Sequence, residues 1–172
     1  MTKISPSIYS RSTENIKQKI EDLIEMGYTR EEILKMIKEI PAILSYSIDT
    51  MKQKRNDLEE LGFTKEEVIY MTKKLPALFG YSKENIKQKV EYLRKMNLEF
   101  IIFKDPKYLI QSLELTQARM NYFYEQEIKL DETNFSKLYY SHPIFEKQFG
   151  ISKKELLEKY GTKAIQKEKT TK

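Results

Sequence analysis

The sequence predicts an all-α protein, an α-solenoid of about four short helical repeats in a curved superhelix, and three observations support this prediction. The hexapeptide ENIKQK occurs at residues 14–19 and again at 84–89, with a diverged copy, DTMKQKRNDLEELG, from residue 49. Residues 12–46 share 16 identities with residues 47–81. No stretch alternates apolar and polar side chains as a β-strand does. A period of 35 residues without strands is typical of stacked helical repeats.

The prolines mark the boundaries of the repeats. Four of the five prolines are followed six residues later by serine, and only Pro143 lacks this serine, as a terminal unit can. The four are Pro6, Pro41, Pro76 and Pro106. We therefore expect a single domain over residues 1–160. Its repeats span approximately 6–40, 41–75, 76–105 and 106–142, with a terminal cap at 143–160 and a flexible basic tail at 161–172.

Each repeat is expected to begin with a helix that starts at a serine. The hydroxyl accepts a hydrogen bond from a free backbone N–H, and an acid two residues later lies at the positive end of the helix. These serines are Ser12, Ser47, Ser82 and Ser112. Apolar side chains follow at helical spacing, as at Ile16, Ile20 and Leu23. Gly27 and Gly62 are expected to end the first two of these helices, since glycine adopts the left-handed conformation at low cost.

A second helix is expected two residues after each of these glycines. Thr29 with Glu32, and Thr64 with Glu67, match the S/T-x-x-E capping box that opens a helix. The apolar residues that follow cover a broad arc, which predicts contacts on two sides of the helix. In the first repeat they are Ile33, Leu34, Met36, Ile37 and Ile40. The PAIL and PALF segments after the second helix suit one short connecting helical turn.

The third repeat is shorter than the first two. Pro106 follows Asn97 by nine residues, whereas Pro41 follows Gly27 by 14. The second helix of this repeat is therefore expected to lose about a turn and a half, which should bend or break the stack.

The fourth repeat is expected to remain helical with a looser pattern. We expect a helix over residues 113–127, a turn at 129–132 and a second helix over 133–140. The terminal cap is expected to contain one more helix, opened by a capping box between Ser152 and Glu155.

The stretch LIEMGYTREEILKMIKEIPAILSYSIDTMKQKRNDLEELGFTKEEVIYMTKKLPALFGYS resembles the mitochondrial transcription termination factor repeat, abbreviated mTERF. The resemblance rests on the leucine–glycine helix end, the T-x-E-E start of the second helix and the K-x-x-P-x-L-x-x-x-S bridge, and it covers roughly residues 6–150. It implies a superhelix of three-helix units whose concave surface binds nucleic acid, generally in organellar gene expression. Pentatricopeptide repeats share the period but not the 14 residues between Gly27 and Pro41.

Three departures from the family pattern bear on the origin of the chain. No organellar targeting segment is recognisable, the third repeat is shortened, and about four repeats form a shorter groove than full-length members have. We therefore expect a short bacterial or phage-borne relative.

The composition excludes several classes of protein. The chain has 172 residues, no cysteine, 40% apolar residues and 33% charged residues, as a soluble globular domain does. Without cysteine it has no disulfide and no thiolate metal site. The N-terminal MTKISPSIYSRS lacks the apolar run of a signal peptide, and no stretch approaches the roughly 18 apolar residues of a membrane span. We expect a cytoplasmic monomer with no membrane partner.

The sequence contains no catalytic constellation, so we expect no enzymatic activity, no metal and no cofactor. His142, the single histidine, precedes a proline and is expected at a helix end. Adjacent acids at Glu31 and Glu32, and at Glu66 and Glu67, resemble acid–base pairs, but they lie in first helical turns where the helix dipole favours them. No glycine-rich phosphate loop or metal-binding His-Glu spacing is present.

The KQK lysines form two columns across the repeats, and either column could follow the phosphates of a nucleic acid. One column contains Lys17, Lys52 and Lys87, and the other contains Lys19, Lys54 and Lys89. The two columns lie about 200° apart around a helix, so at most one can face a ligand. The alternative is a solvated flank whose aliphatic stems cover the core. Arg55 replaces an apolar residue of the stripe, and Glu59, one turn later, is its expected partner.

Positive charge increases towards the C-terminus. Residues 12–46 sum to −2 and residues 117–172 to +3 within a total of +5, an excess that reflects either nucleic-acid binding or a lysine-rich proteome. Basic and aromatic residues alternate in this half and could hold phosphates and stack on bases, although aromatic residues at helical spacing are more often core. The candidate nucleic-acid-binding residues are Lys54, Arg55, Lys89, Arg94, Lys95, Lys104, Lys107, Arg119 and Tyr122.

The leading hypothesis is a non-enzymatic helical-repeat protein that binds DNA or RNA and regulates transcription or replication. The alternative is a protein–protein interaction scaffold that binds a partner in its concave surface, because the first half of the chain is not basic. A self-associating structural module is the third hypothesis.

Overall fold

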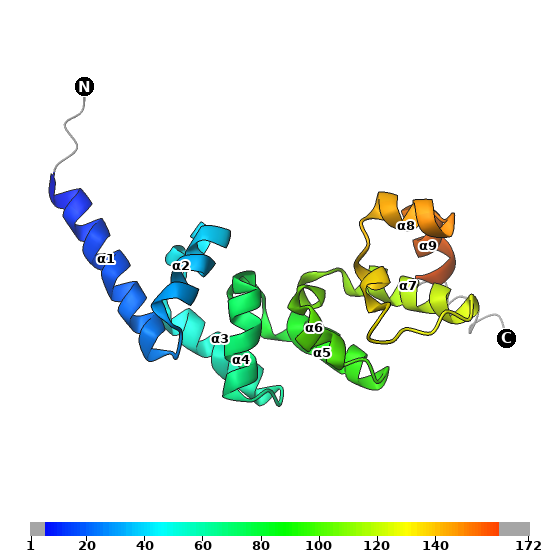
Figure 1. Cartoon of the computed structure of the whole chain (residues 1–172), viewed down its shortest axis with the longest axis horizontal. Helices are drawn as coiled ribbons and strands as arrows, with labels where there is room; N and C mark the ends of the chain where they lie inside the picture. The colour runs from blue at the N-terminus through cyan, green and yellow to red at the C-terminus, as the bar shows by residue number, and fades with distance from the viewer. Residues whose placement is uncertain (1–5, 162–172) are drawn as a thin grey trace, which may run out of the picture. The chain divides into compact units, whose positions relative to one another are not determined.

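The structure, a computed structural model, describes residues 6–161, with side chains from residue 13 onward. Over this range the chain forms α-helices and short 3₁₀ helices and no strand (Figure 1). Three successive repeats each contain an α-helix, a second α-helix and a 3₁₀ helix in that order, so the predicted all-α fold of helical repeats is confirmed. The chain divides into two compact halves, residues 1–87 and 88–172. The prediction of a single domain over residues 1–160 stays a prediction.

The N-terminal half contains the first two repeats. Its elements are α1 (Pro6–Glu25), α2 (Arg30–Glu39), η1 (Pro41–Ser45), α3 (Ile48–Glu60), α4 (Lys65–Lys74) and η2 (Pro76–Gly80). Helix α1 packs on α2 and α3, while α3 packs on α4 and η2. The core contains Leu23, Met26, Tyr28, Ile33, Met36, Ile43, Met51 and Phe79. Because both repeats contribute to this core, neither buries its apolar face alone.

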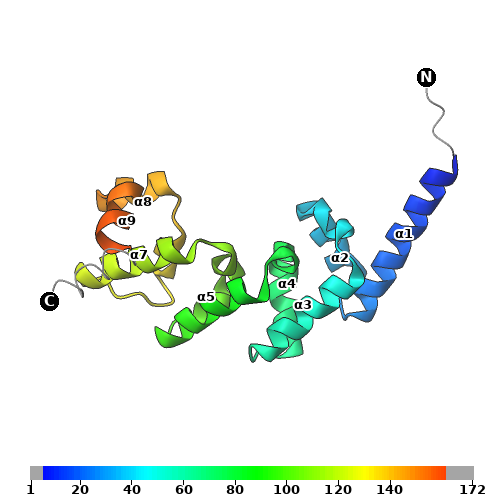
Figure 2. The ribbon, with the colours of Figure 1, turned by 180° about the vertical axis from the view of Figure 1, so that it is seen from behind.

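The C-terminal half begins within α5 (Lys83–Lys95). The later elements are α6 (Phe100–Lys104), η3 (Pro106–Ile110), α7 (Leu113–Glu125), η4 (Phe135–Tyr139), α8 (His142–Phe149) and α9 (Lys153–Tyr160). Helix α9 packs along α7 (Figure 2). The rings of Phe123, Phe145 and Phe149 form an aromatic core between α7 and α8, with the centroids of Phe145 and Phe149 4.6 Å apart.

Most of the predicted helix starts are confirmed. Thr29, Thr64 and Ser152 each form both hydrogen bonds of a capping box. Backbone N–H groups in the first turns of α3, α5 and α7 donate to the hydroxyls of the predicted serines, Ser47, Ser82 and Ser112. Helix α6 has 5 residues where α2 and α4 have 10, which confirms the shortened second helix of the third repeat.

The first helix of every repeat ends in a left-handed turn. The φ angle is +99° at Gly27, +94° at Gly62, +57° at Asn97 and +56° at Glu127. In each turn the next residue donates its N–H to the carbonyl five residues earlier, as in Tyr28 to Leu23 at 3.2 Å, which is the Schellman motif. Because Glu127 is not a glycine, its left-handed backbone conformation costs about 1–2 kcal/mol.

We expect Glu127→Gly to raise the free energy of unfolding by about 0.5–1 kcal/mol, because relief of the left-handed strain exceeds the entropy that glycine adds to the unfolded chain. Urea unfolding followed by circular dichroism measures the change. Glu114→Gly, exposed in the first turn of α7, is the control and should lose about 0.5–1 kcal/mol. Equal losses in both variants would contradict the expected strain at Glu127.

Three expectations about individual elements were wrong. Helix α1 begins at Pro6 rather than at Ser12, because proline fits a first helical turn and nothing in SIYSRS interrupts the helix. Residues 133–140 contain the 3₁₀ helix η4 instead of an α-helix. The Asp131 carboxylate accepts the N–H groups of Thr133 and Asn134, and this local turn competes with a helix start. Leu34 is 55% exposed, so the apolar arc of α2 is narrower than expected.

Among the described residues, no helix combines the length and the apolar content that a bilayer crossing requires.

Candidate nucleic-acid interface

The seventh residue after Ser12, Ser47, Ser82 and Ser112 is basic in all four repeats. In chain order these residues are Lys19, Lys54, Lys89 and Arg119. Lys19 donates from Nζ to the carbonyl of Tyr46 at 2.5 Å, and Lys89 donates to the carbonyl of Leu109 at 2.8 Å. Both carbonyls lie at the end of the 3₁₀ helix in the same repeat, where helical carbonyls lack intrahelical partners. In the first and third repeats this position therefore supplies a cation that caps the 3₁₀ helix.

Arg119 caps η4 with two hydrogen bonds. Its guanidinium donates to the carbonyls of Leu138 at 2.6 Å and of Tyr140 at 2.7 Å. The guanidinium carbon also lies 4.4 Å from the centre of the Phe145 ring, a cation–π contact. Burial lowers the pKa of Arg119 to about 10, so the group stays charged at neutral pH. This charge stabilises the interior of the C-terminal half.

Lys54 is buried beside a carboxylate one turn away. Its Nζ lies 3.1 Å from Oδ2 of Asp57, and Gln53 donates to Oδ1 of the same carboxylate at 3.0 Å. Burial acts to raise the pKa of Asp57, but the hydrogen bonds from Gln53 and Lys54 outweigh it and lower the pKa. The residues Lys54, Lys89 and Arg119 are each at most 6% exposed. A phosphate could reach these three candidates only if their internal hydrogen bonds broke.

Arg55 links α3 to the end of α1. Its Nε lies 3.0 Å from Oε1 of Glu59, which confirms the expected intrahelical pair. A second nitrogen of the guanidinium donates to the carbonyl of Met26 at 3.4 Å. This candidate therefore already contacts the first repeat from the second.

The other lysine column contains exposed side chains. Lys17 and Lys52 are exposed, and Lys87 is half-buried. An acid stands three residues before each lysine, a spacing at which opposite charges share one face of a helix. These acids are Glu14, Asp49 and Glu84. The column is thus close to neutral along its helices, which weakens its attraction for phosphates.

Four candidate cations of the C-terminal half have exposed side chains. Lys95 and Lys107 have no ion-pair partner within residues 13–161. Arg94 pairs with Glu99 at 2.7 Å, and Lys104 pairs with Glu132 at 2.8 Å. Exposed pairs of this kind are worth only about 0–1 kcal/mol. A phosphate could therefore replace either carboxylate at small cost.

The aromatic candidate Tyr122 lies in the core of the C-terminal half. Its side chain is 9% exposed, its hydroxyl donates to the carbonyl of Phe149 at 3.2 Å, and its ring packs against Tyr160 with centroids 5.4 Å apart. A base could stack on Tyr122 only by displacing these rings. Tyr124, two residues later, is 88% exposed and has a free ring face. Both residues are aromatic at neighbouring positions, and the sequence pattern does not indicate which of them is exposed.

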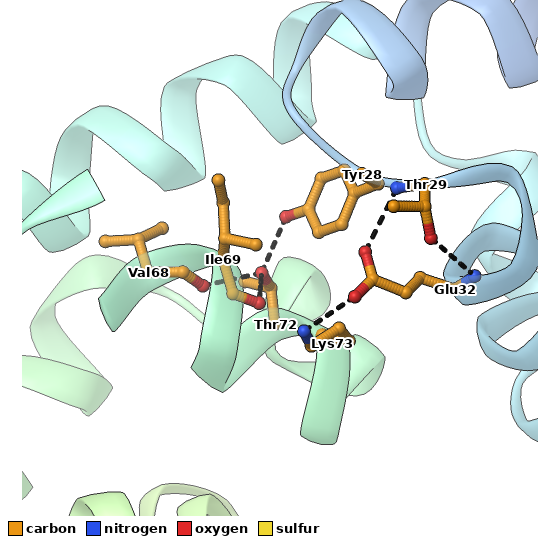
Figure 3. A network of polar contacts seen from close by, with 7 residues as sticks. All are labelled: Tyr28, Thr29, Glu32, Val68, Ile69, Thr72 and Lys73. Carbon is orange, nitrogen blue, oxygen red and sulfur yellow. Dashed lines mark hydrogen bonds and ion pairs between the residues drawn. The ribbon is translucent and has the colours of Figure 1, made fainter. Parts of the chain in front are cut away.

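A buried pair of hydroxyls joins the second repeat to the first (Figure 3). Oη of Tyr28 lies 2.6 Å from Oγ1 of Thr72. Thr72 donates its own proton to the carbonyl of Val68 at 2.6 Å, so Tyr28 is the donor to Thr72. Burial raises the pKa of Tyr28, which keeps the phenol protonated.

An ion pair beside these hydroxyls also joins the two repeats. Nζ of Lys73 in α4 lies 2.7 Å from Oε1 of Glu32 in α2. The other oxygen of Glu32 accepts the N–H of Thr29 at 3.0 Å (Figure 3). The hydrogen bond from Lys73 and that from Thr29 lower the pKa of Glu32. The capping residue of one repeat therefore also binds the next repeat, a role that the capping motif alone does not reveal.

The part of the chain with described side chains has no group of three or more His, Asp or Glu residues that could hold a metal ion. His142 is half-buried at the first residue of α8, as expected for a helix-end residue. Burial, followed by the nearby charges of Lys153 and Arg119, lowers the pKa of His142.

The comparisons with known proteins agree with the repeat geometry. The mTERF family model matches residues 1–146, which include the capping boxes at Thr29 and Thr64, the left-handed turns and the 3₁₀ helices of the repeats. No curated protein and no solved structure matches the chain. On the strength of a match over most of its length, this helical-repeat chain belongs to the mTERF family.

Proposed function

We propose that this protein is a non-enzymatic factor that binds DNA or RNA through phosphate contacts and acts in transcription or replication. Membership of the mTERF family is the observation that carries the proposal, because the family resemblance implies nucleic-acid-binding helical repeats. The exposed cations of the C-terminal half are the groups that we expect to bind the phosphates.

The proposed contact surface consists of Lys95 and Lys107, supported by Arg94 and Lys104. Lys95 and Lys107 present exposed charges, while Arg94 and Lys104 could exchange a carboxylate for a phosphate. Lys54, Lys89 and Arg119 are left out of this surface because their donors already bind internal groups. Tyr124 is the aromatic ring placed to stack on an unpaired base.

Positive charge is also concentrated at the C-terminal end of the chain. Residues 88–161 contain 12 basic and 11 acidic side chains, so their balance is close to neutral. Residues 162–172 contain four lysines and one glutamate. Phosphate attraction is therefore expected to depend on the terminal lysines together with the exposed lysines of the C-terminal half.

The double variant Lys95→Glu, Lys107→Glu is expected to weaken binding to all nucleic-acid sequences alike, by about tenfold or more at low salt, because each lysine lost removes one phosphate contact. The slope of log affinity against log salt should fall by about 1 for each contact removed. Fluorescence anisotropy with single- and double-stranded DNA and RNA over a salt series measures both quantities. Deletion of residues 162–172 tests the terminal lysines in the same assay.

The matched control is the double variant Lys17→Glu, Lys52→Glu, which replaces two exposed lysines of the charge-balanced column, changes the net charge by the same amount and should change the affinity much less. An affinity that stays constant between about 50 and 200 mM salt would contradict phosphate binding. Equal losses in the two double variants would show that net charge, rather than this surface, determines the affinity.

A further inference from the structure

A groove of about 1140 Å³ opens on the C-terminal half, between the end of α5 and the end of α7. Its apolar wall contains Met96, Leu98, Met120, Phe123, Tyr124 and Ile128. Met96 is 40% exposed and Tyr124 is 88% exposed, so this wall presents large apolar side chains to solvent. Leu98 and Phe123 of the same wall are 7% and 1% exposed, so Met96 and Tyr124 are the side chains that a partner could contact.

The fourth repeat lacks its second α-helix beside this groove. In the first three repeats the second helix begins three residues after the left-handed residue, at Arg30, Lys65 and Phe100. In the fourth repeat the left-handed residue is Glu127, and no α-helix begins before His142. Residues 128–130 line the groove instead of starting a helix.

The second repeat shows what normally occupies the equivalent place. Helix α4 lies against the turn that ends α1: Cδ1 of Ile69 is 3.0 Å from the position of a Cβ on Gly27. Thr72 and Lys73 of the same helix reach Tyr28 and Glu32 of the first repeat. Asn97 and Leu98 of the third repeat correspond to Gly27 and Tyr28. A second helix in the fourth repeat would therefore lie along Leu98.

The exposure of equivalent residues agrees with a missing helix. Met26, the residue before the turn of the first repeat, is 4% exposed, whereas Met96 at the same repeat position is 40% exposed. Methionine side chains adapt to the shape of a partner and are frequent in grooves that bind helices. The rim carries Glu125 and Glu127 against the single lysine Lys129, which gives it a net negative charge.

We propose that this groove binds an amphipathic helix of a partner protein, which fills the place of the missing second helix of the fourth repeat. The apolar face of that helix packs on Met96 and Tyr124, the exposed side chains of the wall, and basic side chains on its flank face Glu125 and Glu127. This is the helix-in-groove mode of recognition. The groove shares Tyr124 with the proposed nucleic-acid surface, so the two functions are tested with different variants, Met96→Glu in the groove and the lysine substitutions at the phosphate contacts.

The probe is a lactam-bridged helical peptide with the sequence of residues 64–75, TKEEVIYMTKKL, because α4 fills the equivalent place in the second repeat. The chain has no cysteine, so Lys129→Cys on the rim can carry a single environment-sensitive dye. Titration of the full-length labelled chain is expected to give a dissociation constant on the order of 10–100 µM. Met96→Glu should raise this constant about tenfold, because it places a charge in the apolar wall.

Ile144→Glu is the matched control, since Ile144 is a 53% exposed aliphatic residue on α8 outside the groove wall. It should leave the peptide affinity unchanged. Absence of saturable binding, or equal affinity in Met96→Glu, would overturn the proposal. A dimer that forms with rising concentration and is lost in Met96→Glu would identify a second copy as the occupant instead. Tighter peptide binding after deletion of residues 162–172 would identify the chain's own terminus.

Discussion

Replacement of Arg119 by methionine is expected to lower the free energy of unfolding by about 3 kcal/mol. Methionine keeps much of the aliphatic volume but leaves the carbonyls of Leu138 and Tyr140 without their donor. A buried group left without a hydrogen bond costs about 1–3 kcal/mol. The cation–π contact with Phe145 is lost as well, which adds roughly 1 kcal/mol. Methionine also avoids the desolvation cost of a buried guanidinium, which offsets part of this loss.

Urea unfolding of the full-length chain, followed by far-UV circular dichroism, measures this change. Arg119→Lys keeps the charge but loses the planar fork that reaches two carbonyls, so about half of the loss is expected. Arg94→Met is the control, because Arg94 forms an exposed pair with Glu99 and should cost less than about 1 kcal/mol. If Arg119→Met and Arg94→Met unfold at the same urea concentration, Arg119 does not cap η4 in the way described.

The second large effect is expected at Gly27, where Gly27→Ala should cost about 2 kcal/mol. The backbone there has φ of +99°, and a side chain in the left-handed region costs about 1–2 kcal/mol. The new Cβ would also lie 3.0 Å from Cδ1 of Ile69, so α4 or the side chain of Ile69 must shift. Because this contact joins two repeats, the substitution disturbs their packing as well as the turn.

Gly150→Ala is the matched control for this substitution. Gly150 ends α8 with φ of +68°, and a Cβ there meets nothing within 4 Å. It should therefore cost only the backbone term of about 1 kcal/mol, and the difference between the two variants isolates the contact with Ile69. A loss in Gly27→Ala no larger than that in Gly150→Ala would show that Ile69 adapts without cost.

Local chemistry explains why the helix boundaries could be predicted from the sequence. Thr29 and Thr64 cap their helices through residues three positions away, and Gly27 and Gly62 need only their own backbone freedom to end a helix. The wrong predictions arose where another local interaction competed with the predicted helix. Asp131 satisfies nearby N–H groups in a turn, so the fourth repeat has no second α-helix.

The candidate interface was harder to predict because the chemical type of a residue does not reveal its burial. The repeat places Lys54 and Lys52 two residues apart with the same charge, yet Lys54 is buried beside Asp57 and Lys52 is exposed. Tyr122 and Tyr124 differ in the same way, one inside an aromatic core and the other 88% exposed. Only the packing of neighbouring helices determines which residue of each pair is buried and which is exposed.

The sequence by itself determined the repeat, its period, the order of helix, helix and 3₁₀ turn, and the family, because these depend on short-range hydrogen bonds and on recurring residues. The tertiary structure decided which cations face the interior. Lys89 and Arg119 bind carbonyls 20 and 19 residues away, a distance along the chain at which residue spacing carries no information. The tertiary structure also decided that the fourth repeat leaves an open groove, because a groove depends on how the helices pack against one another.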